Sequence, residues 1–168
     1  VARIEPENSI LEIVRAFSSE VRSQKLVIVG AFNPKSNGYH AKIHEAASEH
    51  VVFLGAIYEK ETVGSLRFHC SLYVHGHTVG GTNPSLIEAL GAGSPVLAHD
   101  NRFNRWVAGE GAAYFIDEQN CFEQFEKLIG NTNLLSKMSR ESIEKHKANY
   151  QWNIVLEQYE QLLLEFAN

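Results

Sequence analysis

The chain has 168 residues, of which 44% are hydrophobic and 21% charged, and its formal net charge is −5. This composition is typical of one globular domain with a sizeable core, and the acidic balance argues against a general nucleic-acid-binding protein. No apolar run approaches the roughly 20 residues that cross a bilayer, and no signal peptide is visible. Two cysteines, Cys70 and Cys121, favour a reducing compartment over a disulfide scaffold, so we expect a cytoplasmic protein.

Short apolar runs alternate with amphipathic stretches along the whole chain. The predicted strands are residues 1–4, 25–29, 51–54, 71–74, 95–98 and 113–116. The predicted helices are residues 10–21, 39–49, 62–69, 84–92, 103–108, 121–129, 134–147 and 152–166. Ser9 and Glu12 have the spacing of a capping box for the first helix. Continuous apolar strands that alternate with helices indicate an α/β fold with a parallel sheet covered on both faces.

Ligands of such sheets bind outside the carboxyl ends of the strands. Residues 80–98 hold the most informative segment at that edge: a glycine loop, a short helix and a buried strand. Gly80 and Gly81 allow positive φ and close backbone approach, Asn83 is a good N-cap, and Pro84 suits the first helical position. The N-terminus of a helix beside a glycine loop binds anions, and Glu88 lies just over one turn inside. The pattern therefore predicts a nucleotide site, with phosphates on the amides and ribose hydroxyls on the carboxylate.

Four motifs follow one another at family-like spacing. They are R-I-E-P-E-N at residues 3–8, L-V-I-V-G at 26–30, F-L-G at 53–55, and P-S-L-I-E-A-L-G-A-G-S-P-V-L-A at 84–98. With them the chain resembles the C-terminal, nucleotide-sugar-binding half of GT-B glycosyltransferases, in the group called glycosyl transferases group 1. Within that group, H-G-H-T-V-G-G-T-N-P-S-L at 75–86 is most similar to bacterial rhamnosyltransferase-type enzymes of polysaccharide synthesis.

The resemblance implies a Rossmann-like domain over residues 1–168, as one part of a larger protein. Its final helix, residues 151–166, would pack toward a missing N-terminal acceptor domain, which would supply most of the catalytic residues. The implied donor-binding residues are Arg3, Ala56, Ile57, His77, Gly80, Gly81, Thr82, Asn83, Pro84, Ser85 and Glu88.

The resemblance also assigns roles. Glu88 would bind the ribose hydroxyls, Arg3 would stabilise the leaving diphosphate, and Ala56 and Ile57 would border the nucleobase. Two positions depart from the family pattern. The first motif glutamate falls on Gly80, where the amides of residues 81–83 can substitute, and the motif lysine falls on Asn8, where His77 can supply a base.

The implied activity is that of the donor half of a retaining, hexosyltransferase-type glycosyltransferase. It would move a sugar, with rhamnose as one candidate, from a dTDP-, UDP- or GDP-linked donor to a glycan or lipid-linked acceptor, and this half alone would be inactive. We expect no cofactor, metal, nucleic acid or transmembrane segment, and a cytoplasmic location that includes the inner membrane face. The alternatives are a stand-alone nucleotide-binding module and half of a sugar-nucleotide epimerase. His75 with His77 and His40 with His44 have metal-ligand spacing, but no cysteine or carboxylate cluster accompanies them.

Overall fold

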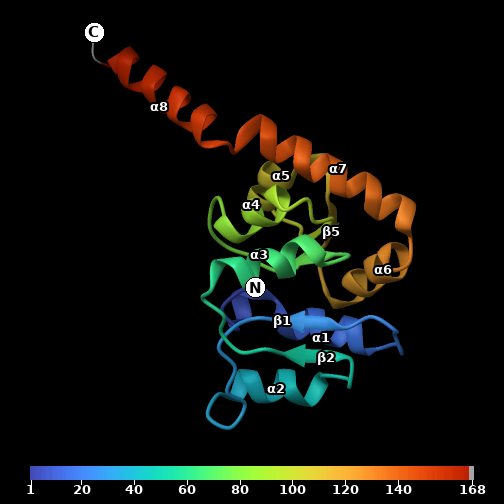
Figure 1. Ribbon diagram of the computed structural model, residues 1–168. Coiled ribbons are helices and arrows are strands. Elements are labelled where there is room, and N and C mark those ends of the chain that lie inside the picture. Colours follow the sequence, from blue (N-terminus) through green and yellow to red (C-terminus); the bar gives the residue numbers. More distant parts are fainter. Residues whose placement is uncertain (167–168) are drawn as a thin grey trace.

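The computed structural model describes residues 1–166, and within that range five parallel strands form the centre of the fold (Figure 1). The strands are β1 (Leu26–Ile28), β2 (Val51–Phe53), β3 (Tyr73–His75), β4 (Val96–His99) and β5 (Ala113–Phe115). They pair in two ladders, β1–β2 and β3–β4–β5. Leu26 lies opposite Val51 in the first ladder, and Tyr73 lies opposite Val96 in the second. All pairs are parallel, which confirms the predicted sheet type.

Helices precede the first strand, connect the strands and follow the last one. They are α1 (Ile10–Ser18), α2 (Gly38–Ala46), α3 (Lys60–His69), α4 (Pro84–Gly91), α5 (Arg102–Ala108), α6 (Glu118–Leu128), α7 (Thr132–Asn149) and α8 (Trp152–Phe166), with 3-10 turns η1 (Pro6–Asn8) and η2 (Gly109–Gly111).

Alternate residues of β4 explain why its apolar run is continuous. Leu97 faces a core shared with α1 and α6, in which Phe17 and Phe125 meet edge to face at 5.7 Å between ring centroids. Val96 and Ala98 face the opposite way, into a core formed with α4 and α5. Helices therefore cover both faces, as the sequence predicts for parallel strands.

Three local expectations were wrong. Residues 1–4 form no strand, although the amide of Ala2 donates to the carbonyl of Val29 at 3.1 Å. Ser9 does not form a capping box with Glu12, because its backbone lies in the left-handed region (φ 47°) and its side chain makes no cap hydrogen bond. The amide of Leu11 donates instead to the hydroxyl of Tyr39, at 3.2 Å. Helix α6 begins at Glu118, before the predicted start at residue 121, because the carboxylate of Asp117 accepts from the amide of Asn120 at 2.8 Å and caps the helix one turn earlier.

Helix α8 has the predicted bounds, but its main contact with the rest of the domain is with α7. It extends away from the other elements beyond α7 (Figure 1), and none of its described residues is buried. The residues of its predicted apolar stripe include Trp152, which is 78% exposed, and Tyr159, which is 62% exposed. None of the helices within residues 1–166 is both long and apolar enough to cross a membrane.

Candidate functional site

The loop after β3 is held from two sides. On one side, the amide of Thr78 donates to the carbonyl of Glu7 at 2.8 Å, and the Thr78 hydroxyl donates to the same oxygen at 3.0 Å. On the other side, the side-chain amides of Asn101 and Asn104 donate to the carbonyl of His77, at 3.0 and 2.9 Å. The loop is thus fixed both to the opening motif and to the start of α5.

Asn8 takes a structural role at the position where the family pattern has a lysine. Its side chain is buried, with Nδ2 donating to the carbonyl of Arg3 at 2.8 Å. Oδ1 is then the acceptor for His77 Nδ1, at 2.5 Å. This bond leaves His77 Nε2 as the free ring nitrogen, and a Cβ added at Gly80 would lie 3.3 Å from it. His77 therefore presents Nε2 toward the glycine loop.

The start of α4 combines occupied and open backbone donors. Asn83 caps the helix by accepting from the amide of Ser85 at 3.0 Å, and Pro84 has no amide hydrogen, so neither Pro84 nor Ser85 offers a backbone donor to a ligand. The Ser85 hydroxyl is also occupied, since it lies 2.9 Å from the Tyr73 hydroxyl. The amides of residues 81–83 make no backbone hydrogen bond among residues 1–166, and Gly80 adopts φ +99°. The open donors are therefore in the loop, just ahead of the helix.

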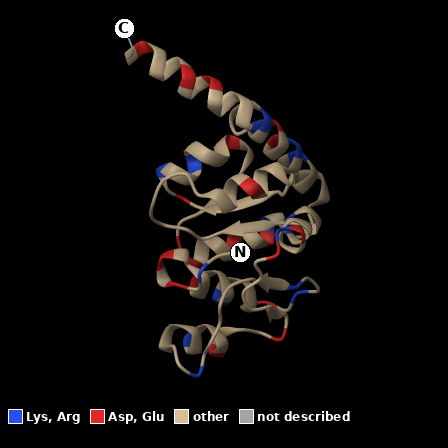
Figure 2. Cartoon of the chain, turned by 60° about the vertical axis from the view of Figure 1, so that its left-hand side comes forward, with Lys and Arg blue, Asp and Glu red and all other residues tan. Residues whose placement is uncertain are grey.

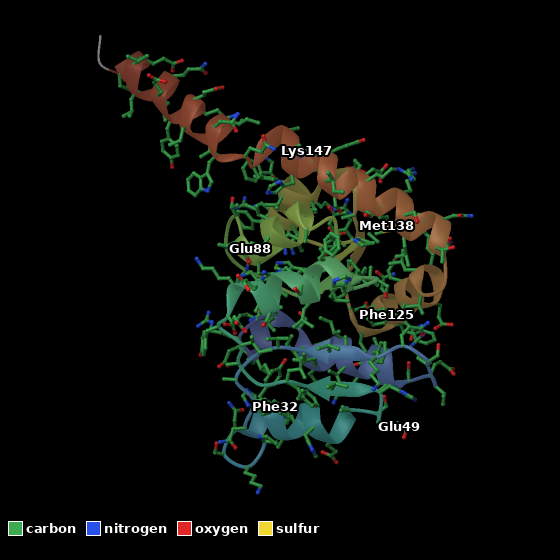
Figure 3. All side chains as sticks on the ribbon, in the orientation of Figure 1. Phe32, Glu49, Glu88, Phe125, Met138 and Lys147 are labelled. Atoms are coloured by element: carbon green, nitrogen blue, oxygen red, sulfur yellow. The ribbon has the colours of Figure 1, made fainter. Side chains whose placement is uncertain are left out.

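Glu88 forms an ion pair that the sequence reasoning missed. Arg67 of α3 places Nη2 2.7 Å from Glu88 Oε2; the arginine side chain is 8% exposed and the glutamate side chain 57% exposed (Figure 3). The buried guanidinium of Arg67 thus fixes one oxygen of the Glu88 carboxylate, while the rest of this carboxylate stays accessible to a ligand. No sequence motif marks Arg67, because the contact joins two helices 21 positions apart.

The remaining predicted residues lie at the same sheet edge but are less constrained. Arg3 has an 80% exposed side chain and a weak ion pair with Glu7, at 3.8 Å. Ala56 is exposed and Ile57 half-buried, in the segment that joins β2 to α3. These three residues are therefore available to a ligand.

Two further histidines near the site are structural. His75 is buried at the end of β3, and this burial, aided by the nearby His77, lowers its pKa to about 3, so it is neutral at physiological pH. His40 uses both ring nitrogens, accepting from the amide of Asn33 at 2.9 Å and donating to the carbonyl of Ile4 at 2.8 Å. Among residues 1–166 no group of three or more His, Cys, Asp or Glu side chains is arranged to hold a metal ion.

The geometry suits a ligand with an anionic part and a polar hydroxylated part. Open amides and the positive end of α4 attract an anion, and the half-exposed carboxylate of Glu88, just over one turn along the helix, can accept hydrogen bonds from hydroxyl groups.

The family model described as "Glycosyl transferases group 1" matches residues 1–148. The chain belongs to this family. No curated protein matches it at the sequence level. Among solved structures, the sucrose-phosphate synthase of Thermosynechococcus elongatus is 18% identical with a TM-score of 0.84, over 99% of this chain and 44% of that one.

Two other solved structures are similar to this glycosyl transferases group 1 chain. HepE from Anabaena, in complex with UDP and glucose, is 16% identical with a TM-score of 0.84, over 98% of this chain and 47% of that one. The C-terminal domain of LpcC, a glycosyl transferase group 1 family protein from Francisella tularensis, is 16% identical with a TM-score of 0.73, over 89% of this chain and 83% of that one. The chain thus spans less than half of the first two proteins, and the predicted α/β fold, the C-terminal domain of GT-B enzymes, is confirmed.

Proposed function

We propose that this chain is the donor-binding domain of a glycosyltransferase that uses a nucleoside diphosphate sugar. One observation carries the proposal: the open amides at residues 81–83 lie just ahead of α4, with Glu88 held by Arg67 just over one turn along the same helix. The diphosphate would bind the amides, the ribose hydroxyls would bind Glu88, and the base would lie toward Ala56 and Ile57. HepE is described in complex with UDP and with UDP-glucose, which makes UDP the first nucleotide to test.

Leaving-group stabilisation would be the chemical contribution of this domain. As the bond from the anomeric carbon to the diphosphate breaks, negative charge develops on the diphosphate, and donors already in place lower the energy of that state. The loop amides, the dipole of α4 and the exposed guanidinium of Arg3 are the groups that would act there. The acceptor, a glycan or lipid-linked sugar, would be bound by another domain. For the reaction itself, we propose that the transferred sugar is rhamnose and that the configuration at its anomeric carbon is retained.

Helix α8 would make the contact with that other domain. Most of its aromatic and aliphatic side chains are exposed, among them Trp152, Tyr159 and Phe166, and exposed apolar stripes of this kind mark interfaces.

Calorimetry with UDP, dTDP and GDP tests the proposal directly. We expect one of the three to bind with a dissociation constant in the micromolar to low millimolar range, and to raise the melting temperature as its concentration increases. A domain that binds none of the three at millimolar concentration would contradict the proposed function. Sugar transfer by a longer protein that contains this domain, and its loss when Glu88 is changed, separates a glycosyltransferase from a nucleotide-binding module without catalysis.

A further inference from the structure

His77, in the loop after β3, is held both by its backbone and by its ring. Its carbonyl accepts from the side-chain amides of Asn101 and Asn104, at 3.0 and 2.9 Å. Its ring bonds through Nδ1 to Oδ1 of Asn8, at 2.5 Å. The second ring nitrogen, Nε2, would lie 3.3 Å from a Cβ added at Gly80. The imidazole is therefore fixed in one orientation, with Nε2 at the glycine loop.

The bond to Asn8 decides which ring nitrogen of His77 carries the hydrogen. Nδ2 of Asn8 donates to the carbonyl of Arg3 at 2.8 Å, and a carbonyl can only accept, so the side-chain amide of Asn8 has one orientation. Its Oδ1 therefore faces His77, and Nδ1 of the ring must donate to it. In a neutral imidazole the other nitrogen then has no hydrogen. Nε2 thus presents a lone pair to the glycine loop, unless the ring takes up a second proton.

The glycine loop favours an anion at the position that this lone pair faces. The amides of residues 81–83 are open, and they lie just ahead of the positive end of α4. A phosphate group bound to them would lie beside Nε2, because Gly80 directly precedes these amides. A lone pair repels the oxygen atoms of a phosphate, whereas a protonated ring donates a hydrogen bond and adds a positive charge. Imidazole is the side chain whose charge changes between pH 5 and 8, so a bound phosphate can bring this change about.

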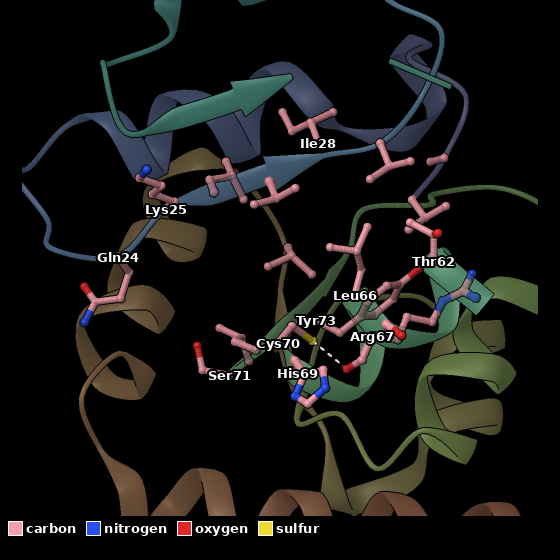
Figure 4. Close-up of a pocket in the computed structure, with 18 of the residues that line it drawn as sticks. Gln24, Lys25, Ile28, Thr62, Leu66, Arg67, His69, Cys70, Ser71 and Tyr73 are labelled. Atoms are coloured by element: carbon pink, nitrogen blue, oxygen red, sulfur yellow. Dashed lines mark hydrogen bonds between the residues drawn. The ribbon is translucent and has the colours of Figure 1, made fainter. Parts of the chain in front are cut away.

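The titratable and charged groups around His77 come from every element of the site. They are Arg3 and Glu7 in the opening motif, His75 on β3, Arg67 and Glu88 on α3 and α4, and His99, Asp100, Arg102 and Arg105 on and after β4. Each of these acids already has a cation: Glu7 pairs with Arg3, Glu88 with Arg67 and Asp100 with Arg105. Arg67, which Figure 4 shows among the residues that line a cavity beside β3, has an 8% exposed side chain, so its charge serves Glu88 rather than a ligand.

The two neighbouring histidines do not compete for the proton. Burial, aided by the nearby His77, lowers the pKa of His75 to about 3, and burial also lowers the pKa of His99 below its ordinary value, so both are neutral at pH 7.5. The guanidinium of Arg102 stacks on the ring of Phe103, 4.5 Å from its centroid. The negative charge that draws a proton to His77 therefore has to come from the ligand.

We propose that His77 takes up one proton from the solvent when a nucleoside diphosphate sugar binds, and that its Nε2–H then donates to the diphosphate. This role of His77 rests on the proposed function, because the diphosphate is what draws the proton. The complex then holds one more proton than the free chain and the free nucleotide sugar together. Affinity should therefore rise as the pH falls through the neutral range, by up to about tenfold per pH unit.

Calorimetric titration with UDP-glucose, dTDP-glucose and GDP-glucose measures this proton directly. Their diphosphates are esterified at both ends and do not titrate between pH 6 and 8, unlike a terminal phosphate, whose second pKa is about 6. Each is titrated at pH 7.5 in PIPES and in Tris, because the dependence of the apparent binding enthalpy on the ionisation enthalpy of the buffer gives the number of protons taken up. His77→Gln is the test variant, and His69→Gln, on the exposed surface of α3, is the matched control.

We expect uptake of about half to one proton per bound nucleotide sugar in the unmodified chain and in His69→Gln, and none in His77→Gln. From pH 8 to pH 7 the affinity of the unmodified chain should rise by at least about threefold, and that of His77→Gln should stay constant. NMR of the ring nitrogens should show the hydrogen on Nδ1 of His77 in the free chain and hydrogens on both nitrogens in the complex. This measurement decides the question even where His77→Gln does not fold.

Binding without proton uptake would overturn this role of His77 and leave the proposed function intact. So would uptake that persists in His77→Gln, or a neutral ring with its hydrogen on Nε2 in the free chain. Affinity that rises with pH would show instead that Nε2 accepts from a sugar hydroxyl. Failure of all three nucleotide sugars to bind at millimolar concentration would contradict the proposed function, and the role of His77 with it.

Discussion

Two long-range contacts between polar side chains decide the shape of the candidate site. Asn8 bonds to His77 across 69 positions of sequence, and Arg67 bonds to Glu88 between two helices. Each contact joins a buried partner to a more exposed one, so that the ligand-facing group is oriented by a group that water does not reach. Changing the exposed member of a pair therefore affects binding, and changing the buried member affects both binding and folding.

Substitution of Glu88 by alanine should lower nucleotide affinity by roughly ten- to hundred-fold, the loss of one or two hydrogen bonds to a charged acceptor. Calorimetry with the nucleotide that binds the unmodified chain measures the change. Because alanine also leaves Arg67 without its partner, Glu88→Gln is the companion variant, which keeps an acceptor for the guanidinium. Glu144→Ala, on the exposed surface of α7, is the matched control. An unchanged dissociation constant for Glu88→Ala would remove this residue from the site.

Acid should destabilise the protein through His75. The pKa of its imidazole is lowered to about 3 by burial, below its ordinary value of 6.5, so protonation favours the unfolded chain. Its contribution to stability is present above pH 6.5 and is lost as the pH falls toward 3, by up to about 1.4 kcal/mol per pH unit. Urea unfolding at pH 7.5, 6.0 and 5.0 gives the slope. His75→Phe should flatten it, whereas exposed His69→Phe should keep it; equal slopes for the two variants would show that His75 is not the group responsible.

At the scale of single elements, the local signals of the sequence predicted the structure well. Asn83 caps α4, Pro84 occupies its first turn, and Leu86 and Leu90 are buried, because these features depend on residues within one or two turns. Helix α6 was predicted to begin too late because apolar periodicity starts only after its polar cap. Arg67 was missed altogether, since no spacing within a helix reveals a partner on another helix. The sequence thus predicted the elements of the site better than the contacts that hold them.

The glycine after β3 gives a sharp test at this scale. A Cβ added at Gly76 would collide with the carbonyl oxygen of Asn8 and lie 2.7 Å from Cδ1 of Ile13. Gly76→Ala should therefore cost about 1–3 kcal/mol of unfolding free energy, because the backbone of the opening motif has to move. Gly81→Ala is the matched control, since nothing lies within 4 Å of its added Cβ. Denaturant titration compares them, and equal stability of the two variants would show that the close approach at Gly76 is not required.

At the scale of the whole molecule, the packed part of the domain ends with α7. Helix α8 extends away from it. Tyr150 still anchors the chain, because its hydroxyl donates to the carbonyl of Val107 at 3.1 Å, but none of the described residues after it is buried. Most of the stability of the domain therefore resides in residues 1–150.

Truncation after Tyr150 should leave the melting temperature within about 2 °C of the full chain, because none of the described residues that it removes is fully buried. Differential scanning calorimetry of the two proteins makes the comparison. The truncated protein should also bind the nucleotide with unchanged affinity, since no element of the candidate site lies beyond α5. A drop of more than about 5 °C would mean that α8 contributes to the fold of the isolated domain.

The charges of α8 restrict what its apolar stripe can meet. The helix carries Glu157, Glu160 and Glu165 and no lysine or arginine, and Figure 2 shows red but no blue along it. Cytoplasmic leaflets are negatively charged, and helices that lie on them carry cations beside their apolar face. Lipid headgroups would therefore repel this helix, and a complementary protein surface with basic side chains around an apolar strip is the neighbour it is suited to meet.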